Sequence, residues 1–297
     1  MPANAVPGHT SDFREVHFIS GLPRSGSTLL AGILRQNPRF HASMSSPVAG
    51  LLNGVLEQTG AGSEFYPFFD EALRKRLCHA LFAAYYEDKA ANHEVLFDTN
   101  RQWTARLHQL TELFGDFKVI CCVRNPAWIM DSFEVIYRKN PFDYSRMFNA
   151  ASRQTVYTRC EALMSAGGAV GAAWTALKEA YYGEFSDRLL LVDYDLLTQH
   201  PGRTLELIYQ FLGEPGFDHD FDQVDYAESE FDATLGVKGL HSVKKKVTYQ
   251  PRRSILPPDL FVKYQGMDFW QDPQGTAAHS IAPKKHPPTS SAPRDGH

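Results

Sequence analysis

A phosphate-binding turn between a strand and a helix constrains this chain more than any other feature. The stretch VHFISGLPRSGSTLLAGIL begins at Val16, and its apolar, β-branched start predicts a strand that ends at Gly21. Residues 27–36 carry apolar side chains at helical spacing and predict a helix. A glycine-containing turn that enters a helix presents unpaired backbone N–H groups and the positive end of the helix dipole to an anion. The chain is therefore expected to contain a strand–turn–helix unit that holds a phosphate or sulfate.

This turn differs from the nucleoside triphosphate-binding loop at one position. Gly21, Gly26 and Thr28 fit the frame G-x-x-x-x-G-K-[ST], but Ser27 replaces the lysine that contacts the β- and γ-phosphates. Arg24 offers a permanent, delocalised charge instead, and the neighbouring hydroxyls add donors. The expected anion ligands, without a metal ion, are Arg24, Ser25, Gly26, Ser27 and Thr28.

Strands alternate with helices along the rest of the chain. The run FKVICCVR is nearly continuous in apolar residues, as in a strand buried on both faces of a parallel sheet. Further strands are expected at EVLFDT and RLLLVDYDLL, and helices at residues 71–90, 126–139, about 145–165, 170–182 and 201–213. This alternation predicts an α/β fold with a P-loop-like parallel sheet flanked by helices, in a single domain.

Composition separates this domain from its ends and excludes several classes of protein. Residues 1–14 are expected to be flexible, residues 15–270 to form the domain, and residues 271–297, poor in large apolar side chains, to form a disordered tail. The net charge of −4 and the absence of a long apolar run or secretory signal argue against nucleic acid and membrane as partners. Four cysteines without metal-ligand spacing indicate a reducing compartment, so a cytoplasmic protein is expected.

A second anion site is expected where the clearest strand ends. Arg124 leaves that strand at its carboxyl end, where ligands of open α/β sheets bind. Ser132 lies about two turns into the following helix. An arginine at a strand end and a serine on the next helix can hold a second phosphate together. The alternative is a strand-end ion pair beside a surface serine.

Taken together, these motifs resemble the sulfotransferases that use 3′-phosphoadenosine 5′-phosphosulfate (PAPS), and the tyrosylprotein sulfotransferase branch in particular. GLPRSGSTLL resembles the 5′-phosphosulfate loop of that branch, and VRNPAWIMDS resembles the 3′-phosphate motif. LVDYDLL resembles the strand whose tyrosine, here Tyr194, contacts the nucleotide. HSVKKKVTYQPRRSILP resembles the C-terminal cofactor loop, which implies that Ser242 and either Arg252 or Arg253 bind the nucleotide. The resemblance implies transfer of a sulfuryl group from PAPS to an acceptor hydroxyl, with release of 3′,5′-ADP.

The acceptor side departs from this family pattern. The resemblance implies a glutamate base after the first helix, but Ser45 occupies that position, and Thr99 replaces a family lysine, with Arg101 as a nearby substitute. The remaining candidates for the base are His241, whose imidazole titrates near neutral pH, Asp98 at the end of a predicted strand, and His41. Each also has a structural explanation: a surface histidine, a helix cap or partner of Arg101, and a histidine packed beside Phe40.

Three functions therefore stay open on the sequence alone. The first is a PAPS-dependent sulfotransferase whose acceptor is a small molecule, such as a phenol, or a tyrosine-containing peptide. The second is a P-loop kinase of small molecules that takes its lysine from elsewhere. The third is a nucleotide-binding relative that has lost catalysis. The oligomeric state is not predicted.

Overall fold

A six-stranded sheet forms the centre of the protein, in a computed structural model that describes residues 13–140, 142, 148–224 and 245–283. Its strand order is β2-β3-β1-β4-β5-β6, and every strand pair is parallel. The strands are β1 (Glu15–Gly21), β2 (Phe40–Ala42), β3 (Val95–Thr99), β4 (Val119–Val123), β5 (Leu189–Asp193) and β6 (His279–Ile281). The predicted single α/β domain with a parallel sheet is confirmed, and all carboxyl ends meet at one edge.

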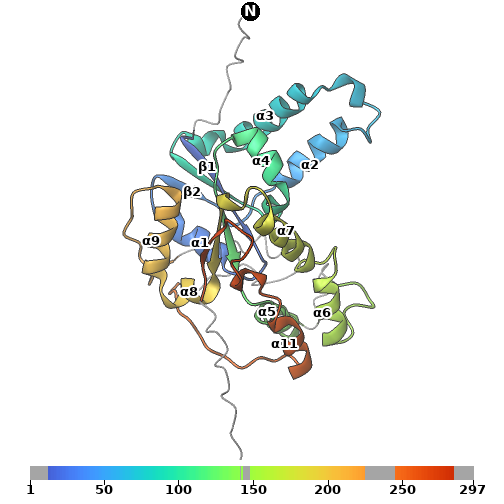
Figure 1. The fold of residues 1–297 in the computed structure, drawn as a ribbon, viewed down its shortest axis with the longest axis vertical. Coiled ribbons are helices and arrows are strands. Elements are labelled where there is room, and N and C mark those ends of the chain that lie inside the picture. Colours follow the sequence, from blue (N-terminus) through green and yellow to red (C-terminus); the bar gives the residue numbers. More distant parts are fainter. Residues whose placement is uncertain (1–12, 141, 143–147, 225–244, 284–297) are drawn as a thin grey trace, which may run out of the picture.

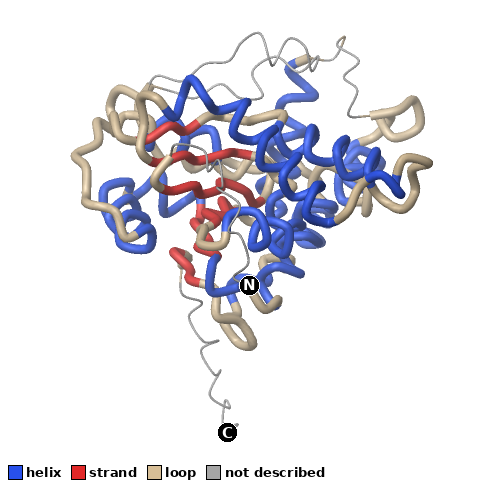
Figure 2. The backbone as a smooth tube through the Cα atoms, turned by 90° about the horizontal axis from the view of Figure 1, so that it is seen from above, coloured by secondary structure: helices blue, strands red, loops and turns tan. Residues whose placement is uncertain are grey.

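Helices cover both faces of this sheet (Figures 1 and 2). One face packs against α1 (Ser27–Leu34), α8 (Tyr194–Gln199) and α9 (Pro201–Leu212). The other packs against α2 (Val48–Thr59), α3 (Glu71–Ala90), α4 (Leu107–Phe114), α5 (Pro126–Lys139), α6 (Val156–Met164), α7 (Gly171–Tyr182) and α11 (Pro258–Gln265). Short 3₁₀ turns are η1 (Tyr66–Phe68), η2 (Trp103–Arg106), η3 (Ser186–Arg188) and η4 (Phe269–Gln271).

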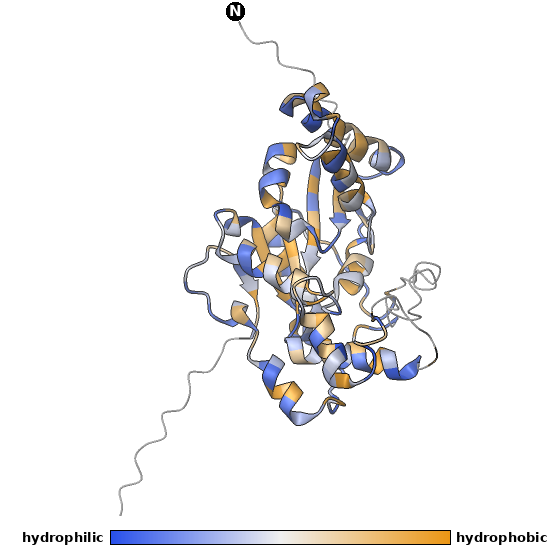
Figure 3. Ribbon diagram, turned by 90° about the vertical axis from the view of Figure 1, so that its right-hand side faces the viewer, coloured by the Kyte–Doolittle hydropathy of each residue, from blue (hydrophilic) through white to orange (hydrophobic). Residues whose placement is uncertain are grey.

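Alternation along the strands divides the hydrophobic core between the two faces. Phe18 and Cys121 join the core beneath α2–α7, whereas Ile19 and Cys122 join the core beneath α1, α8 and α9. Figure 3 shows the hydrophobic residues along the central strands. The adjacent Cys121 and Cys122 therefore point to opposite faces of the sheet, and all four cysteines are free and buried.

One predicted strand ends earlier than expected, and one predicted helix begins later. The strand predicted through Leu197 stops at Asp193, because the Asp193 carboxylate accepts hydrogen bonds from the backbone N–H groups of Asp195 (2.9 Å) and Leu196 (3.2 Å) and caps α8. The helix predicted from about residue 145 begins only at Val156. Thr155 begins this helix with a capping box. Its hydroxyl accepts a hydrogen bond from the backbone N–H of Thr158, and the Thr158 hydroxyl accepts one from the backbone N–H of Thr155.

The prediction of a disordered tail from residue 271 is wrong for its first part. The Tyr181 hydroxyl donates to the backbone carbonyl of Asp272 over 3.2 Å, and β6 adds a parallel strand to β5. The side chains of β6 are largely exposed, so backbone pairing rather than apolar burial holds this strand. Composition therefore gave no sign of it. Residues 284–297 lie outside the described residues.

Candidate functional site

The turn after β1 has the backbone of an anion cradle. Gly21 has a φ of 103°, and a Cβ there would lie 2.2 Å from the carbonyl oxygen of Cys122 on β4, so only glycine fits this close approach. Gly26, with a φ of 94°, begins α1, and no side chain caps that helix. The first N–H groups of α1 are therefore left for a ligand, beside the half-buried hydroxyls of Ser27 and Thr28.

Arg24 lies at the centre of this turn in a rarely populated backbone conformation. Its φ of 59° is the one positive value among the described residues other than glycine. Its Nε donates to the Ser132 hydroxyl over 3.1 Å. Ser25 is buried beside it, and its own hydroxyl donates to the carbonyl of Pro23. A left-handed arginine is an unfavourable conformation that the surrounding structure must hold, and such conformations cluster at functional sites.

Arg124 and Tyr194 lie beside this turn, at the same edge of the sheet. The Arg124 guanidinium lies 4.3 Å from the centre of the Tyr194 ring. A Cβ at Gly26 would lie 2.8 Å from Cδ2 of Tyr194, so the ring packs directly against the anion cradle. Burial lowers the pKa of Arg124, and its Nε is buried without a hydrogen-bond partner in the described part of the chain. An unpaired buried donor on a cation fits an anion that the protein is built to receive.

The segment after residue 250 contributes the last predicted residues. The Arg252 guanidinium forms an ion pair with Asp131 and lies 5.2 Å from the centre of the Trp128 ring on α5. Arg253 is exposed. The structure thus brings Arg24, Ser132, Arg124, Tyr194 and Arg252 to one edge of the sheet. His241 and Ser242 lie outside the described residues.

The Asp98 side chain is not accessible to an acceptor molecule, as the side chain of a general base would have to be. Its side chain is completely buried at the end of β3. One carboxylate oxygen accepts hydrogen bonds from the hydroxyls of Ser46 (2.6 Å) and Tyr86, and the other accepts one from Trp103 Nε1 (2.7 Å). Burial raises the pKa of Asp98. Three neutral donors hold this buried carboxyl, an arrangement typical of a structural role, and the catalytic assignment of Asp98 stays a prediction.

The other acceptor-side candidates are dispersed. Ser45 and Arg101 are exposed, and no hydrogen bond between Arg101 and Asp98 is present among the described contacts. His41 lies within β2, its ring edge-on to Tyr86 and His93, rather than beyond the carboxyl end of the strand. Burial lowers its pKa to about 4. A base weakened in this way and held inside the sheet is poorly suited to proton abstraction at neutral pH.

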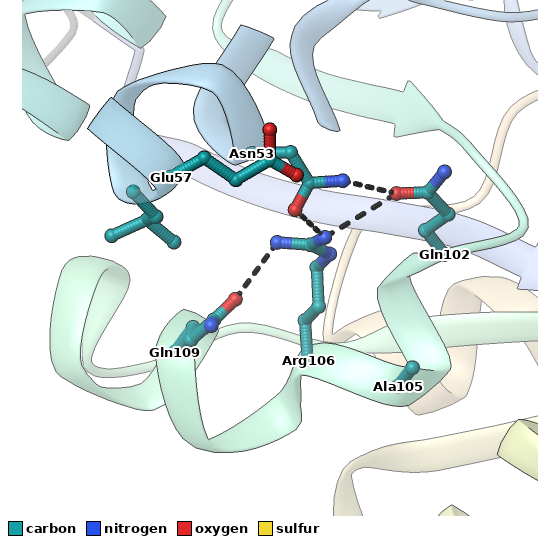
Figure 4. Close-up of a pocket in the computed structure, with 7 residues that line it drawn as sticks. Asn53, Glu57, Gln102, Ala105, Arg106 and Gln109 are labelled. Carbon is teal, nitrogen blue, oxygen red and sulfur yellow. Dashed lines mark hydrogen bonds between the residues drawn. The ribbon is translucent and has the colours of Figure 1, made fainter. Parts of the chain in front are cut away.

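An open pocket of about 590 Å³ lies between α2 and the turn that follows β3. Figure 4 shows Arg106 at its centre, donating to the amide oxygens of Asn53, Gln102 (3.4 Å) and Gln109 (3.0 Å), with Glu57 opposite. No carboxylate forms an ion pair with Arg106 among the residues that the structure describes. This pocket could not be predicted from the sequence, because its polar lining comes from three separate elements.

Within the described ranges, no three histidine, cysteine, aspartate or glutamate residues are grouped so that they could hold a metal ion. The helices in those ranges are all too short or too polar to cross a bilayer.

Comparison with known proteins gives the family. The model of the sulfotransferase family matches residues 17–219, more than half of the chain. Among solved structures, the sulfotransferase domain of the Synechococcus PCC 7002 olefin synthase is similar at 19% identity and a TM-score of 0.44, over 88% of this chain and 90% of that one. The sulfotransferase domain of the curacin biosynthetic pathway is similar at 16% identity and a TM-score of 0.49, over 86% and 92%. No curated protein matches the sequence. The family match extends from β1 beyond α9 and includes both anion motifs, and the chain belongs to the sulfotransferase family.

Proposed function

We propose that this chain transfers a sulfuryl group from PAPS to an acceptor hydroxyl and releases 3′,5′-ADP. The observation that carries the proposal is the arginine pair at the carboxyl ends of adjacent strands: Arg24, bonded to Ser132, and Arg124, whose buried Nε has no described partner. A nucleotide with phosphates at two positions needs two such anion sites. The Tyr194 ring, packed against both Gly26 and Arg124, offers a surface between them.

Each residue then has a distinct role. PAPS, when bound, supplies the activated sulfuryl group. Arg24 and the free N–H groups of α1 face the 5′-phosphosulfate side and stabilise charge that develops on the leaving phosphate. Arg124, Ser132, Arg252 and Ser242 hold the 3′-phosphate, since arginine binds two phosphate oxygens at once. No pair of β- and γ-phosphates has to be bridged, which accounts for Ser27 in place of lysine.

The acceptor approaches from the other half of the edge. The donor residues follow β1, β4 and β5, whereas the Arg106 pocket lies beside the turn after β3. The positive charge and amide groups of this pocket suit a polar or anionic part of the acceptor. With Asp98 sealed, His241 remains the proposed base. A small molecule with a phenolic hydroxyl and a tyrosine-containing peptide are both compatible with this arrangement.

Calorimetric titration of the full chain tests the donor. We expect binding of 3′,5′-ADP without a divalent metal and no comparable binding of ATP with Mg²⁺. Binding of ATP that requires Mg²⁺, without a response to 3′,5′-ADP, would favour the kinase instead. An acceptor screen with radiolabelled PAPS then follows, beginning with phenols and tyrosine peptides. Binding of 3′,5′-ADP with no transfer to any acceptor would favour a nucleotide-binding relative without catalysis.

A further inference from the structure

A buried carboxylate stands directly before the serine of the second anion site. Asp131 precedes Ser132 in α5, and its side chain has no exposed surface. A charge removed from water in this way needs ion-pair and hydrogen-bond partners. Its partners come from residues 252–255, more than a hundred positions later in the chain. Asp131 is therefore the anchor that fastens this later segment to α5.

The anchor uses both carboxylate oxygens. Oδ1 accepts hydrogen bonds from the Ser254 hydroxyl (2.8 Å) and from the backbone N–H of Ile255 (2.7 Å). Oδ2 faces the guanidinium of Arg252 in an ion pair. The Ser254 hydroxyl in turn accepts from the backbone N–H of Leu256 (3.1 Å), which fixes the local turn. The backbone and the charged side chain of the segment are thus held by one carboxylate.

This anchor determines where the Arg252 charge lies. The guanidinium is held between Asp131 and the face of Trp128, but 36% of the side chain stays exposed. Burial lowers the pKa of Arg124, Tyr194 and Asp195 raise it, the charge of Arg252 lowers it, and the charge of Asp131 raises it by the smallest amount. The charges of the two arginines therefore act on each other, and the Asp131 carboxylate, which pairs with Arg252, opposes part of that repulsion.

We propose that Asp131 is a positioning residue that holds Arg252 beside Arg124, so that the two guanidinium groups and the Ser132 hydroxyl bind one phosphate of the donor nucleotide. This inference rests on the proposed function, because it assigns the means by which that nucleotide's second phosphate is held. Asp131 itself does not touch the nucleotide. Without its charge, Arg252 is free to leave the site, and the repulsion from Arg124 favours its departure.

A second buried carboxylate in the same helix provides a matched control. Glu134 forms ion pairs with Arg138 and Arg159, each over 2.8 Å, and its side chain is 2% exposed. It resembles Asp131 in burial and charge but binds arginines outside the predicted site. Loss of its charge tests the general effect of disturbing α5.

A double-mutant cycle measured by calorimetric titration with 3′,5′-ADP tests the proposal. The variants are Asp131→Asn, Arg252→Gln, the double variant and Glu134→Gln. Asparagine keeps an oxygen for Ser254 and Ile255 and replaces the charged oxygen that faces Arg252 with an uncharged NH2 group. We expect Asp131→Asn and Arg252→Gln each to weaken binding roughly tenfold. Because Asp131 acts through Arg252, the double variant should bind no more weakly than Arg252→Gln alone, and Glu134→Gln should bind like the parent.

Each outcome is decisive. Equal affinities of the parent and Asp131→Asn, or fully additive losses in the double variant, would overturn the positioning role and leave the proposed function intact. Failure of the parent itself to bind 3′,5′-ADP would remove the proposed donor and this inference together. If Asp131→Asn does not fold, Ser254→Ala removes one bond of the anchor at a half-buried position. That variant is expected to lose roughly threefold in affinity, and parental affinity would refute the anchor.

Discussion

The side chains of Arg24 and Ser132 meet over 3.1 Å, which joins the turn after β1 to the helix after β4. The two anion motifs, separated by about a hundred residues in the sequence, therefore form one site. The hydrogen bond uses Nε, one of the three nitrogens of a guanidinium group that keeps its positive charge. This geometry makes Arg24 both a structural bridge and a source of charge.

Arg24→Ala should abolish most of the sulfuryl transfer. Loss of a charge that stabilises the leaving phosphate is expected to lower kcat roughly 10²–10³-fold. Arg203→Ala is a suitable control, because Arg203 is an exposed arginine on α9 whose ion pair is with Glu206. Steady-state kinetics with radiolabelled PAPS would measure both. Similar rates for the two variants would remove Arg24 from the mechanism.

Gly21→Ala should destabilise the fold. The new Cβ would collide with the Cys122 carbonyl at 2.2 Å, and the φ of 103° is strained for any other residue. We expect a loss of about 2–4 kcal/mol in the free energy of unfolding. Gly54→Ala in α2 has open space and should instead gain about 0.5–1 kcal/mol. Urea denaturation compares the two, and equal stabilities would show that the β1–β4 contact is looser than described.

Asp98→Asn distinguishes a structural from a catalytic carboxyl. Asparagine offers one oxygen to three donors, so the variant should lose about 1–3 kcal/mol of stability. At a temperature where it remains folded, we expect kcat within a fewfold of the parent and an unchanged pH dependence of the rate. A fall in kcat of two orders of magnitude without loss of stability would instead make Asp98 the base.

Arg106→Gln tests the pocket between α2 and the turn after β3. Removal of its charge should raise the KM for an anionic or strongly polar acceptor roughly tenfold. Affinity for 3′,5′-ADP should not change, since the donor residues follow other strands. Lys75→Gln, which removes a half-buried cation on α3 that is paired with Glu71 and Glu112, is the charge-matched control. An acceptor KM that stays at the parental value would show that the acceptor binds elsewhere.

His41 should make stability depend on pH on the acid side. Burial, with the charges of His93, Lys89 and Arg35, lowers its pKa from 6.5 to about 4. Between these values the unfolded chain binds a proton that the folded chain does not, so stability is lost as the pH falls from about 6.5 through 4. His41→Gln should remove about 1–2 kcal/mol of this pH-dependent change, after allowance for solvent screening. If the free energy of unfolding changes equally with pH in the parent and the variant over this range, the expectation is wrong.

Sequence periodicity predicted the elements that bury apolar side chains at regular spacing. The buried run of β4 and the helix that starts at Pro126 appear where they were expected, because apolar period and proline position are local signals. The end of β5 was misplaced because a single carboxylate, Asp193, starts α8 there. The strand β6 was missed because its side chains are largely exposed.

The sequence predicted only those parts of the site whose residues lie close together within one motif. The loop around Arg24 and the pair of Arg124 and Ser132 have fixed spacing, so the chain order alone placed them together. The surroundings of Asp98 could not be predicted, because its burial and its three donors, Ser46, Tyr86 and Trp103, are set by the packing of separate elements. Asp131 was missed for the same reason, although it lies within the quoted motif: its partners follow by more than a hundred residues.

The outermost strand has a practical meaning for anyone who shortens this chain. Composition invites removal of everything after Trp270, yet that cut would delete β6 and leave Leu190, Leu191 and Val192 with unpaired backbone groups along an open edge. An uncovered apolar strand is a template for pairing with other molecules. A segment whose polar composition gave no sign of structure thus covers the edge of β5. If a shortened protein precipitates, that result would therefore carry no information about the chemistry of the site.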